Sequence, residues 1–293
     1  MTTYFTIDGK TIDSNATIEH LVNDRGLAYG HGLFETILYR CGELPLIKWH
    51  LKRISGDAQK VGISIQSQQI EDYLNQFIGR LQLKKITEGI IKVIVTAGVG
   101  GRGYAVPDKI KASVICTYAS LPKNMKGPSQ EGIAVRCCEH RLPFNRPLAG
   151  IKHLNRLDQI IARAEWNNSD YAEGLLSTVD DQLIEGISAN LFLKDATGNW
   201  LTPDLTLVGV CGVMRSVLLD KLFANSHIMI KVAKIDLKQL NSCKEMFVCN
   251  SIRGIVPVNS IYTSDNQLLN TLPLGEQTLM LKTQLTKMYP HYQ

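Results

Sequence analysis

The chain has 293 residues, of which 44% are hydrophobic and 20% are charged, values typical of globular proteins and sufficient for two domains. The net charge is +5 and no run of five or six basic residues occurs, which argues against nucleic-acid binding and favours small anionic ligands at most. The seven cysteines form no Cys-x-x-Cys pair, so neither disulfides nor a metal site are expected. With no signal peptide and no membrane span evident, we expect a cytoplasmic protein.

The first part of the chain predicts a small α+β domain. Turn signals such as Asp8-Gly9 lie between alternating apolar positions, which is typical of hairpins. Apolar residues at helical spacing predict two helices after them. The predicted elements are hairpins over 4–12 and 33–46, helices over 47–61 and 67–80, and strands over 89–96 and 111–118.

Residues 121–130 predict a linker, because two prolines and a glycine lie there among polar residues without periodicity. We therefore expect an N-terminal domain over 1–120 and a larger C-terminal domain over 131–293. The predicted elements of the second domain are strands over 132–138, 174–179, 190–193 and 245–249 and helices over 157–166 and 213–222. The mixture indicates an α+β or mixed α/β fold with two domains.

A glycine-rich link over 98–104 satisfies the pattern G-x-G-x-x-G after a predicted strand. Dinucleotide binding also needs a helix directly after it, whereas a proline and another strand follow here. A nucleotide-dependent oxidoreductase is therefore disfavoured. The link instead presents Arg102, whose guanidinium fork suits a carboxylate, although an ordinary hairpin loop would look the same.

Three further segments hold chemically useful residues, each with a plain structural alternative. Lys152 follows a glycine and an apolar residue, and a desolvated lysine can form a Schiff base. Glu185 interrupts an apolar strand, so it needs a cationic partner, either a protonated pyridine nitrogen or a neighbouring arginine. Residues 211–215 open a helix, whose first N–H groups can bind phosphate. A surface lysine, an internal ion pair and an ordinary helix end would explain the same patterns.

Taken in their order along the chain, these segments resemble the fold-type-IV pyridoxal-phosphate enzymes. That family includes branched-chain aminotransferases, D-amino-acid aminotransferases and aminodeoxychorismate lyases, and the resemblance covers nearly the whole chain. It is carried by Asp24-Arg-Gly-Leu-Ala-Tyr-Gly-His-Gly-Leu-Phe-Glu-Thr, the helix with His50 and Arg53, Ile151-Lys-His-Leu-Asn-Arg, Glu185-Gly-Ile-Ser-Ala-Asn-Leu-Phe, Gly212-Val-Met-Arg and Cys249-Asn-Ser-Ile-Arg-Gly.

The resemblance implies a role for each segment. Lys152 would form the Schiff base with pyridoxal 5'-phosphate, and Glu185 would pair with the pyridine nitrogen. The phosphate would be bound by Arg53, by the backbone of Val213 and Met214, and by Ser251. The family fold has a small N-terminal and a larger C-terminal domain with the cofactor between them, and its members are usually homodimers.

Within the family, the glycine-rich link and the segment Gly150-Ile-Lys-His-Leu-Asn-Arg-Leu resemble the aminodeoxychorismate lyases. The implied reaction converts 4-amino-4-deoxychorismate, a small anionic amine, into 4-aminobenzoate and pyruvate for folate biosynthesis. Arg102 would bind a substrate carboxylate, and Asn250 would make a second polar contact. His31 departs from the pattern, since an acidic residue is frequent there. An aminotransferase acting on a D-amino or branched-chain acid, and a binding protein without turnover, are the alternatives.

Overall fold

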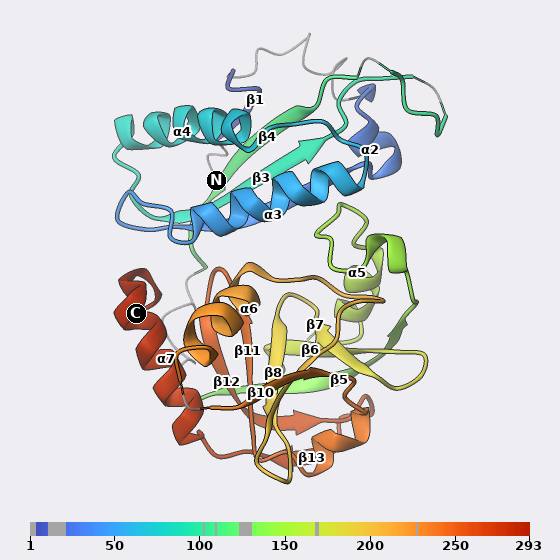
Figure 1. Ribbon diagram of the computed structural model, residues 1–293, viewed down its shortest axis with the longest axis vertical. Coiled ribbons are helices and arrows are strands. Elements are labelled where there is room, and N and C mark those ends of the chain that lie inside the picture. Colours follow the sequence, from blue (N-terminus) through green and yellow to red (C-terminus); the bar gives the residue numbers. More distant parts are fainter. Residues whose placement is uncertain are drawn as a thin grey trace. The chain divides into compact units, whose positions relative to one another are not determined.

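The computed structural model describes residues 4–10, 22–101, 103–108, 110–122, 131–167, 170–226 and 228–293. The chain divides into two units, which are described separately (Figure 1). Unit 1 is Met1–Pro122 together with Lys152–Asn155, and unit 2 is Lys123–Ile151 together with Arg156–Gln293. Most of the predicted linker, over 123–130, and Arg102 lie outside the described residues. The expected domain limits stay a prediction, and the short segment around Lys152 groups with the first unit.

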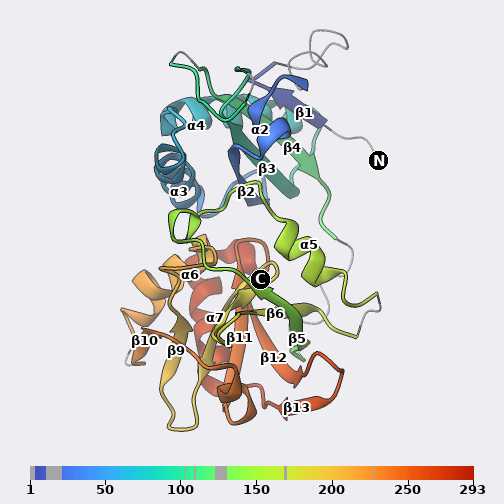
Figure 2. The same ribbon diagram turned by 90° about the vertical axis from the view of Figure 1, so that its right-hand side faces the viewer.

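Unit 1 is built on a four-stranded antiparallel sheet in the order β1-β4-β3-β2. Helix α3 packs on β2 and on α4, and α4 packs on β4 (Figure 2). The elements are β1 (Tyr4–Ile7), α2 (Arg25–Tyr29), β2 (Gly32–Tyr39), α3 (Ile47–Lys60), α4 (Ser67–Leu83), β3 (Gly89–Thr96) and β4 (Ser113–Ala119). The two helices predicted from apolar spacing are confirmed.

The predicted hairpin over 33–46 is confirmed at its turn, where Arg40 and Glu43 form an antiparallel bridge, but residues 44–46 form no return strand. Strand β2 is present, but the chain only turns after it, and Leu46 takes a left-handed conformation with φ of 65° before α3 begins. The partner of β2 is β3, about fifty residues further on, with Gly32 opposite Thr96 and Tyr39 opposite Gly89. In this long-range pairing, five of the seven β2 residues from Leu33 to Tyr39 are buried.

Unit 2 is built on a nine-stranded mixed sheet in the order β10-β9-β8-β11-β12-β5-β6-β7, with β13 paired to β12. The pairs β9 with β10, β5 with β12 and β5 with β6 are parallel. The strands are β5 (Ile133–Leu142), β6 (Glu173–Thr178), β7 (Leu183–Gly186), β8 (Asn190–Lys194), β9 (Trp200–Pro203), β10 (Ile230–Ala233), β11 (Glu245–Asn250), β12 (Gly254–Tyr262) and β13 (Leu268–Thr271). The expected mixed α/β fold is confirmed.

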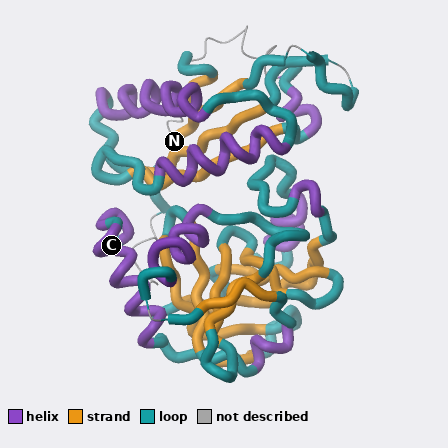
Figure 3. Tube along the Cα trace, in the orientation of Figure 1, coloured by secondary structure: helices purple, strands orange, loops and turns teal. Residues whose placement is uncertain are grey.

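Helices lie around the strands of unit 2 (Figure 3). They are α5 (Leu157–Arg163), α6 (Val213–Val217), α7 (Glu276–Met288), a π-helix η3 (Leu218–Phe223) and short 3₁₀ turns η2 (Arg146–Leu148), η4 (Leu237–Asn241) and η5 (Pro290–Tyr292). Helix α6 runs directly into η3, so the predicted helix from residue 213 is present. Among the described residues, no helix has the length and apolar character needed to cross a membrane.

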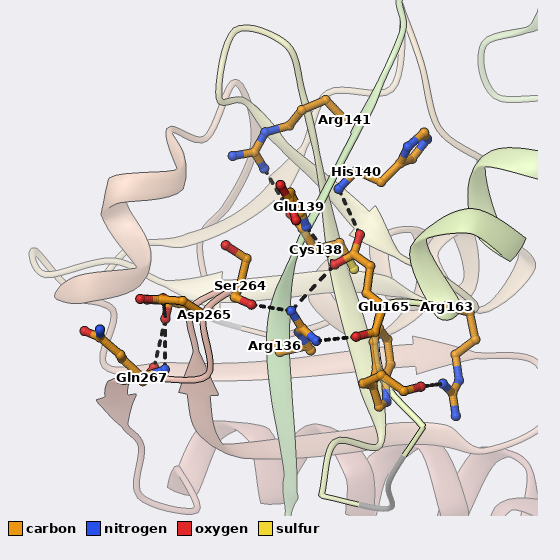
Figure 4. Close-up of polar contacts among 12 residues, drawn as sticks. Arg136, Cys138, Glu139, His140, Arg141, Arg163, Glu165, Ser264, Asp265 and Gln267 are labelled. Atoms are coloured by element: carbon orange, nitrogen blue, oxygen red, sulfur yellow. Dashed lines mark hydrogen bonds and ion pairs between the residues drawn. The ribbon is translucent and has the colours of Figure 1, made fainter.

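A polar network fixes α5, the helix that follows the Lys152 segment in the chain (Figure 4). The carboxylate of Glu165, just after α5, accepts the backbone N–H groups of Glu139 and His140 at 2.8 and 2.9 Å, where β5 shifts register against β6. Arg136 of β5 is 4% exposed and donates to the carbonyl oxygen of Glu165. His140 Nε2 lies 2.9 Å from an oxygen of Asp158 on α5. Both ends of α5 are thereby bound to β5.

Candidate active site

Lys152 lies along the edge strand of the unit 1 sheet. Its carbonyl oxygen accepts the N–H of Phe34 at 3.1 Å, and the N–H of Leu154 donates to Gly32 at 2.9 Å. A Cβ at Gly32 would come within 2.7 Å of both the carbonyl oxygen of Val95 and a Leu154 methyl carbon, so this close approach requires glycine. The half-buried Lys152 places Nζ 4.2 Å from the centroid of the Phe34 ring, where a cation is attracted by the aromatic face. The backbone of the lysine is therefore fixed, and its amine lies against an apolar ring.

Glu35 of β2 and Arg53 of α3 form a buried ion pair. Arg53 Nε donates to Glu35 at 2.7 Å, and Arg53 Nη2 donates to the second carboxylate oxygen. His50 Nδ1 lies 2.6 Å from that same oxygen. Burial alone would raise the pKa of Glu35, but the charges and hydrogen bonds of Arg53 and His50 outweigh it and lower the pKa to about 2. Glu35 is therefore an ionised carboxylate that orients both side chains.

His50 is neutral in this arrangement. Burial lowers the pKa of its imidazole more than the charge of Glu35 raises it. A neutral ring that donates through Nδ1–H to Glu35 keeps Nε2 as an acceptor, and Nε2 is buried with no partner among the described residues. The charge of Lys152 also lowers the pKa of His50. The two side chains thus belong to one electrostatic environment.

Glu185 is held in unit 2 by the loop before α6. It lies on β7, is 4% exposed, and accepts the N–H of Val210 at 2.8 Å. Gly150 pairs with the same loop, because its N–H donates to Gly209 at 2.8 Å and its carbonyl oxygen accepts from Cys211 at 3.0 Å. The residue two positions before Lys152 is therefore bonded to the loop that holds Glu185.

Glu185 also has a cationic neighbour within unit 2. Burial lowers the pKa of Arg156, and the negative charges of Glu185 and Asp158 offset only part of this effect. An arginine is one of the two cationic partners that the sequence predicts for Glu185. Arg156 thus supplies a positive charge near the carboxylate of Glu185.

The start of α6 presents backbone N–H groups next to that loop. Val213 and Met214 are 4% and 1% exposed, and the preceding Gly212 makes no side-chain cap. A Cβ at Gly212 would lie 1.9 Å from the side-chain oxygen of Asn190, so a larger residue would displace this amide, which donates to the carbonyl oxygen of Val210 at 2.8 Å. The first N–H groups of a helix have no partner within the helix and carry partial positive charge. They suit a phosphate group.

The turn after β11 carries Ser251 and Asn250. The side-chain oxygen of Asn250 accepts the N–H groups of Ile252 at 3.1 Å and Arg253 at 2.8 Å, and its amide donates to the carbonyl oxygen of Ser188 at 3.2 Å. Asn250 thus shapes its own turn, and among the described residues one contact of its amide is seen, to Ser188. The position of Ser251 is fixed by this turn.

The structure groups most of the predicted residues within their own unit. In unit 1, Lys152 and Arg53 share an environment with His50 and Glu35, and in unit 2 the segment 209–214 joins Glu185 to the start of α6. Glu35 was missed, because its role depends on partners that α3 brings to β2 and that no short motif reveals. Arg102 lies outside the described residues, and its role stays a prediction.

Comparison with known proteins finds relatives along nearly the whole chain. Residues 32–261 match the family described as Amino-transferase class IV. The aminodeoxychorismate lyase of Vibrio harveyi is 32% identical over 266 residues, covering 90% of this chain and 94% of that protein. A putative branched-chain-amino-acid aminotransferase of Methanocaldococcus jannaschii is 27% identical, covering 94% and 93%. The crystal structure of 4-amino-4-deoxychorismate lyase from Pseudomonas aeruginosa matches with a TM-score of 0.86 at 34% identity, covering 98% and 99% of the two chains.

Proposed function

We propose, on the premise that this chain belongs to the amino-transferase class IV family of pyridoxal-phosphate-dependent enzymes, that it is an aminodeoxychorismate lyase. It would convert 4-amino-4-deoxychorismate into 4-aminobenzoate and pyruvate. The lyases of V. harveyi and P. aeruginosa support this reading, at 32% and 34% identity over nine tenths of the chain or more. The glycine-rich link and the segment around Lys152 support it as well.

The residues present fit the cofactor. One observation carries the assignment, namely that segment 209–214 bonds to Gly150, holds the carboxylate of Glu185 and opens α6 with uncapped N–H groups. The buried Nε2 of His50 adds an acceptor in the environment of Lys152. The groups that would hold the cofactor are Lys152 at the aldehyde, Glu185 at the pyridine nitrogen, and Arg53, Val213, Met214 and Ser251 at the phosphate.

Arg53 can serve the phosphate while it is paired with Glu35. Arg53 binds Glu35 through Nε and Nη2, and the guanidinium fork of an arginine also suits a phosphate group. The carboxylate fixes the guanidinium plane before any ligand arrives, so little side-chain entropy is lost on binding. The neutral His50 adds no positive charge that would repel a cation nearby.

When bound, the cofactor supplies an electron sink for the bond cleavage. Lys152 Nζ is the group that moves protons: it takes the proton from the ring carbon that bears the amine and returns a proton to the departing enolpyruvate carbon. The C–O bond to the ring breaks, and the ring becomes aromatic. The Phe34 ring lies beside this amine, 4.2 Å from Nζ. Arg102 would bind one of the two substrate carboxylates, and Asn250 would add a polar contact.

The decisive experiment compares two reactions of the purified holoenzyme. With 4-amino-4-deoxychorismate we expect pyruvate and 4-aminobenzoate in equal amounts, and no amino transfer to 2-oxoglutarate from D-alanine or a branched-chain acid. The aminotransferase of M. jannaschii makes transamination the second candidate. Amino transfer without pyruvate release would refute the lyase and leave the family assignment intact.

Two further expectations accompany the lyase proposal. The protein would be cytoplasmic, and it would form a homodimer like most members of the family. Light scattering of the purified holoenzyme would give the oligomeric state directly, and a monomeric mass would refute the dimer.

A further inference from the structure

Arg25 is a buried cation that is surrounded by backbone carbonyl groups. It begins α2 and is 2% exposed, yet no carboxylate of a described residue forms an ion pair with it. A buried guanidinium needs acceptors for its N–H groups. Its acceptors come from the glycine-rich link, whose position is thereby coupled to the arginine.

The guanidinium binds the link on both sides of residue 102. Nη1 donates to the carbonyl oxygen of Gly103 at 3.0 Å and to that of Gly101 at 3.4 Å, and Nη2 donates to Tyr104 at 3.2 Å. The backbone N–H of Arg25 donates to Gly98 at 3.0 Å. The chain before and after residue 102 is therefore fixed to a single side chain.

Tyr29, one turn further along α2, makes a second attachment. Its hydroxyl oxygen accepts the N–H of Gly103 at 2.9 Å, and its ring lies 5.7 Å from the ring of Tyr104 in an edge-on arrangement. The guanidinium of Arg25 lies 4.9 Å from the centroid of the Tyr29 ring. Gly103 adopts a φ of +79°, which glycine tolerates and which lets both of its backbone polar groups face α2.

His31 fixes the remaining side of the guanidinium. Arg25 Nε donates to His31 Nδ1 at 3.4 Å, and His31 Nε2 lies 2.8 Å from the carbonyl oxygen of Val61. A carbonyl group only accepts, so Nε2 carries the hydrogen and Nδ1 is the acceptor. His31 thus engages Nε without adding a negative charge, and Nη1 and Nη2 remain directed to the link.

We propose that Arg25 is a positioning residue for substrate binding: it fixes the backbone at Gly101, Gly103 and Tyr104, the neighbours of Arg102, which the sequence predicts to bind a substrate carboxylate. The inference rests on the proposed function. Four of the five N–H groups of Arg25 donate to Gly101, Gly103, Tyr104 and His31. Its effect should therefore pass through Arg102.

Steady-state kinetics of the holoenzyme test that path. Arg25→Gln should raise KM for 4-amino-4-deoxychorismate by about ten-fold or more, while kcat changes by less than about three-fold and the cofactor absorbance stays unchanged. Arg25→Lys keeps the charge but lacks the guanidinium fork, so its KM should lie between that of Arg25→Gln and that of the wild type. In an Arg102→Ala background, Arg25→Gln should have no further effect on kcat/KM. If the effects of Arg25→Gln and Arg102→Ala on kcat/KM were fully additive in free energy, the proposal would be overturned.

Limited trypsin digestion tests the backbone directly and without turnover. Cleavage between residues 102 and 103, measured by mass spectrometry of the holoenzyme, should be about ten-fold faster in Arg25→Gln, because the population of open loop rises. Arg80→Gln is the matched control, since Arg80 also donates to one backbone carbonyl group, that of Gly9 at 2.8 Å, and it should leave this cleavage rate and KM unchanged.

The outcomes separate the two proposals. If wild-type enzyme releases no pyruvate, the lyase proposal fails, and the digestion still decides whether Arg25 fixes the link. An unchanged cleavage rate at 102 in Arg25→Gln would overturn the inference. Loss of cofactor absorbance in both Arg25→Gln and Arg25→Lys would overturn it too, because Arg25 would then support the whole unit.

Discussion

Single side chains in unit 1 show how burial and charge set the chemistry of the site. Lys152 and Lys92 both place Nζ over the ring of Phe34, at 4.2 and 4.8 Å. Lys92 is exposed on β3, whereas Lys152 is half-buried beside β2. Only the second is in the electrostatic environment of His50. Contact with an aromatic ring therefore does not distinguish the two amines, and their surroundings do.

The pair provides a matched test of the cofactor lysine. Lys152→Ala should abolish the visible absorbance of the bound cofactor and its sensitivity to borohydride, because no other amine is expected to form the Schiff base. Lys92→Ala should retain both. Absorbance spectra before and after borohydride give the answer, and a borohydride-sensitive Lys152→Ala protein would rule out the assignment.

Glu35 and His50 predict how stability depends on pH. The pKa of Glu35 falls from 4.5 to about 2, so its contribution is complete above pH 4.5 and is lost as the pH falls toward 2. The pKa of His50 lies below its ordinary 6.5, so the unfolded chain takes up that proton first, and stability already declines below pH 6.5.

Urea unfolding of the protein between pH 7 and pH 3 measures both effects. Glu35→Gln should flatten the loss of stability below pH 4.5. The exposed Glu88→Gln should follow the wild-type curve. An unchanged acid limb in Glu35→Gln would show that Glu35 is not the group that titrates.

Local patterns predicted individual elements better than their pairing. The apolar spacing of α3 and α4 gave their positions, since a helix needs only local hydrogen bonds and one buried face. The partner of β2 could not be derived, because β3 lies far along the chain and the left-handed turn at Leu46 has no glycine to mark it. Glu35 was missed for the same reason, since its partners lie on another element.

The loop before α6 makes a prediction at the level of elements. Gly212→Ala would place a Cβ 1.9 Å from the side-chain oxygen of Asn190, so we expect a loss of about 1–3 kcal/mol of stability and weaker cofactor binding. Gly79→Ala is the control: nothing lies within 4 Å of the new Cβ on α4, and alanine should stabilise that helix by roughly 0.5–1 kcal/mol. Thermal unfolding and cofactor titration measure both. A Gly212→Ala protein as stable as wild type, with equal cofactor affinity, would contradict this account of the loop.

At the scale of the whole molecule, the predicted cofactor residues are distributed over both units. Lys152 and Arg53 belong to unit 1, and Glu185, Val213 and Ser251 belong to unit 2. No single segment was specific, and the resemblance lay in the order of the segments along one chain. Composition and periodicity predicted a mixed fold with two parts. They could not predict that Lys152–Asn155 groups with unit 1, because this grouping depends on backbone hydrogen bonds to the edge of β2.

The grouping of Lys152–Asn155 with unit 1 limits how the protein can be divided into fragments. Residues 1–122 contain the strands and helices of unit 1, but a fragment ending there lacks the segment that covers the edge of β2. An uncovered edge strand invites pairing with other chains and aggregation. Neither unit is therefore an interchangeable module, and recombination within this family has to exchange the Lys152 segment together with the strand that it borders.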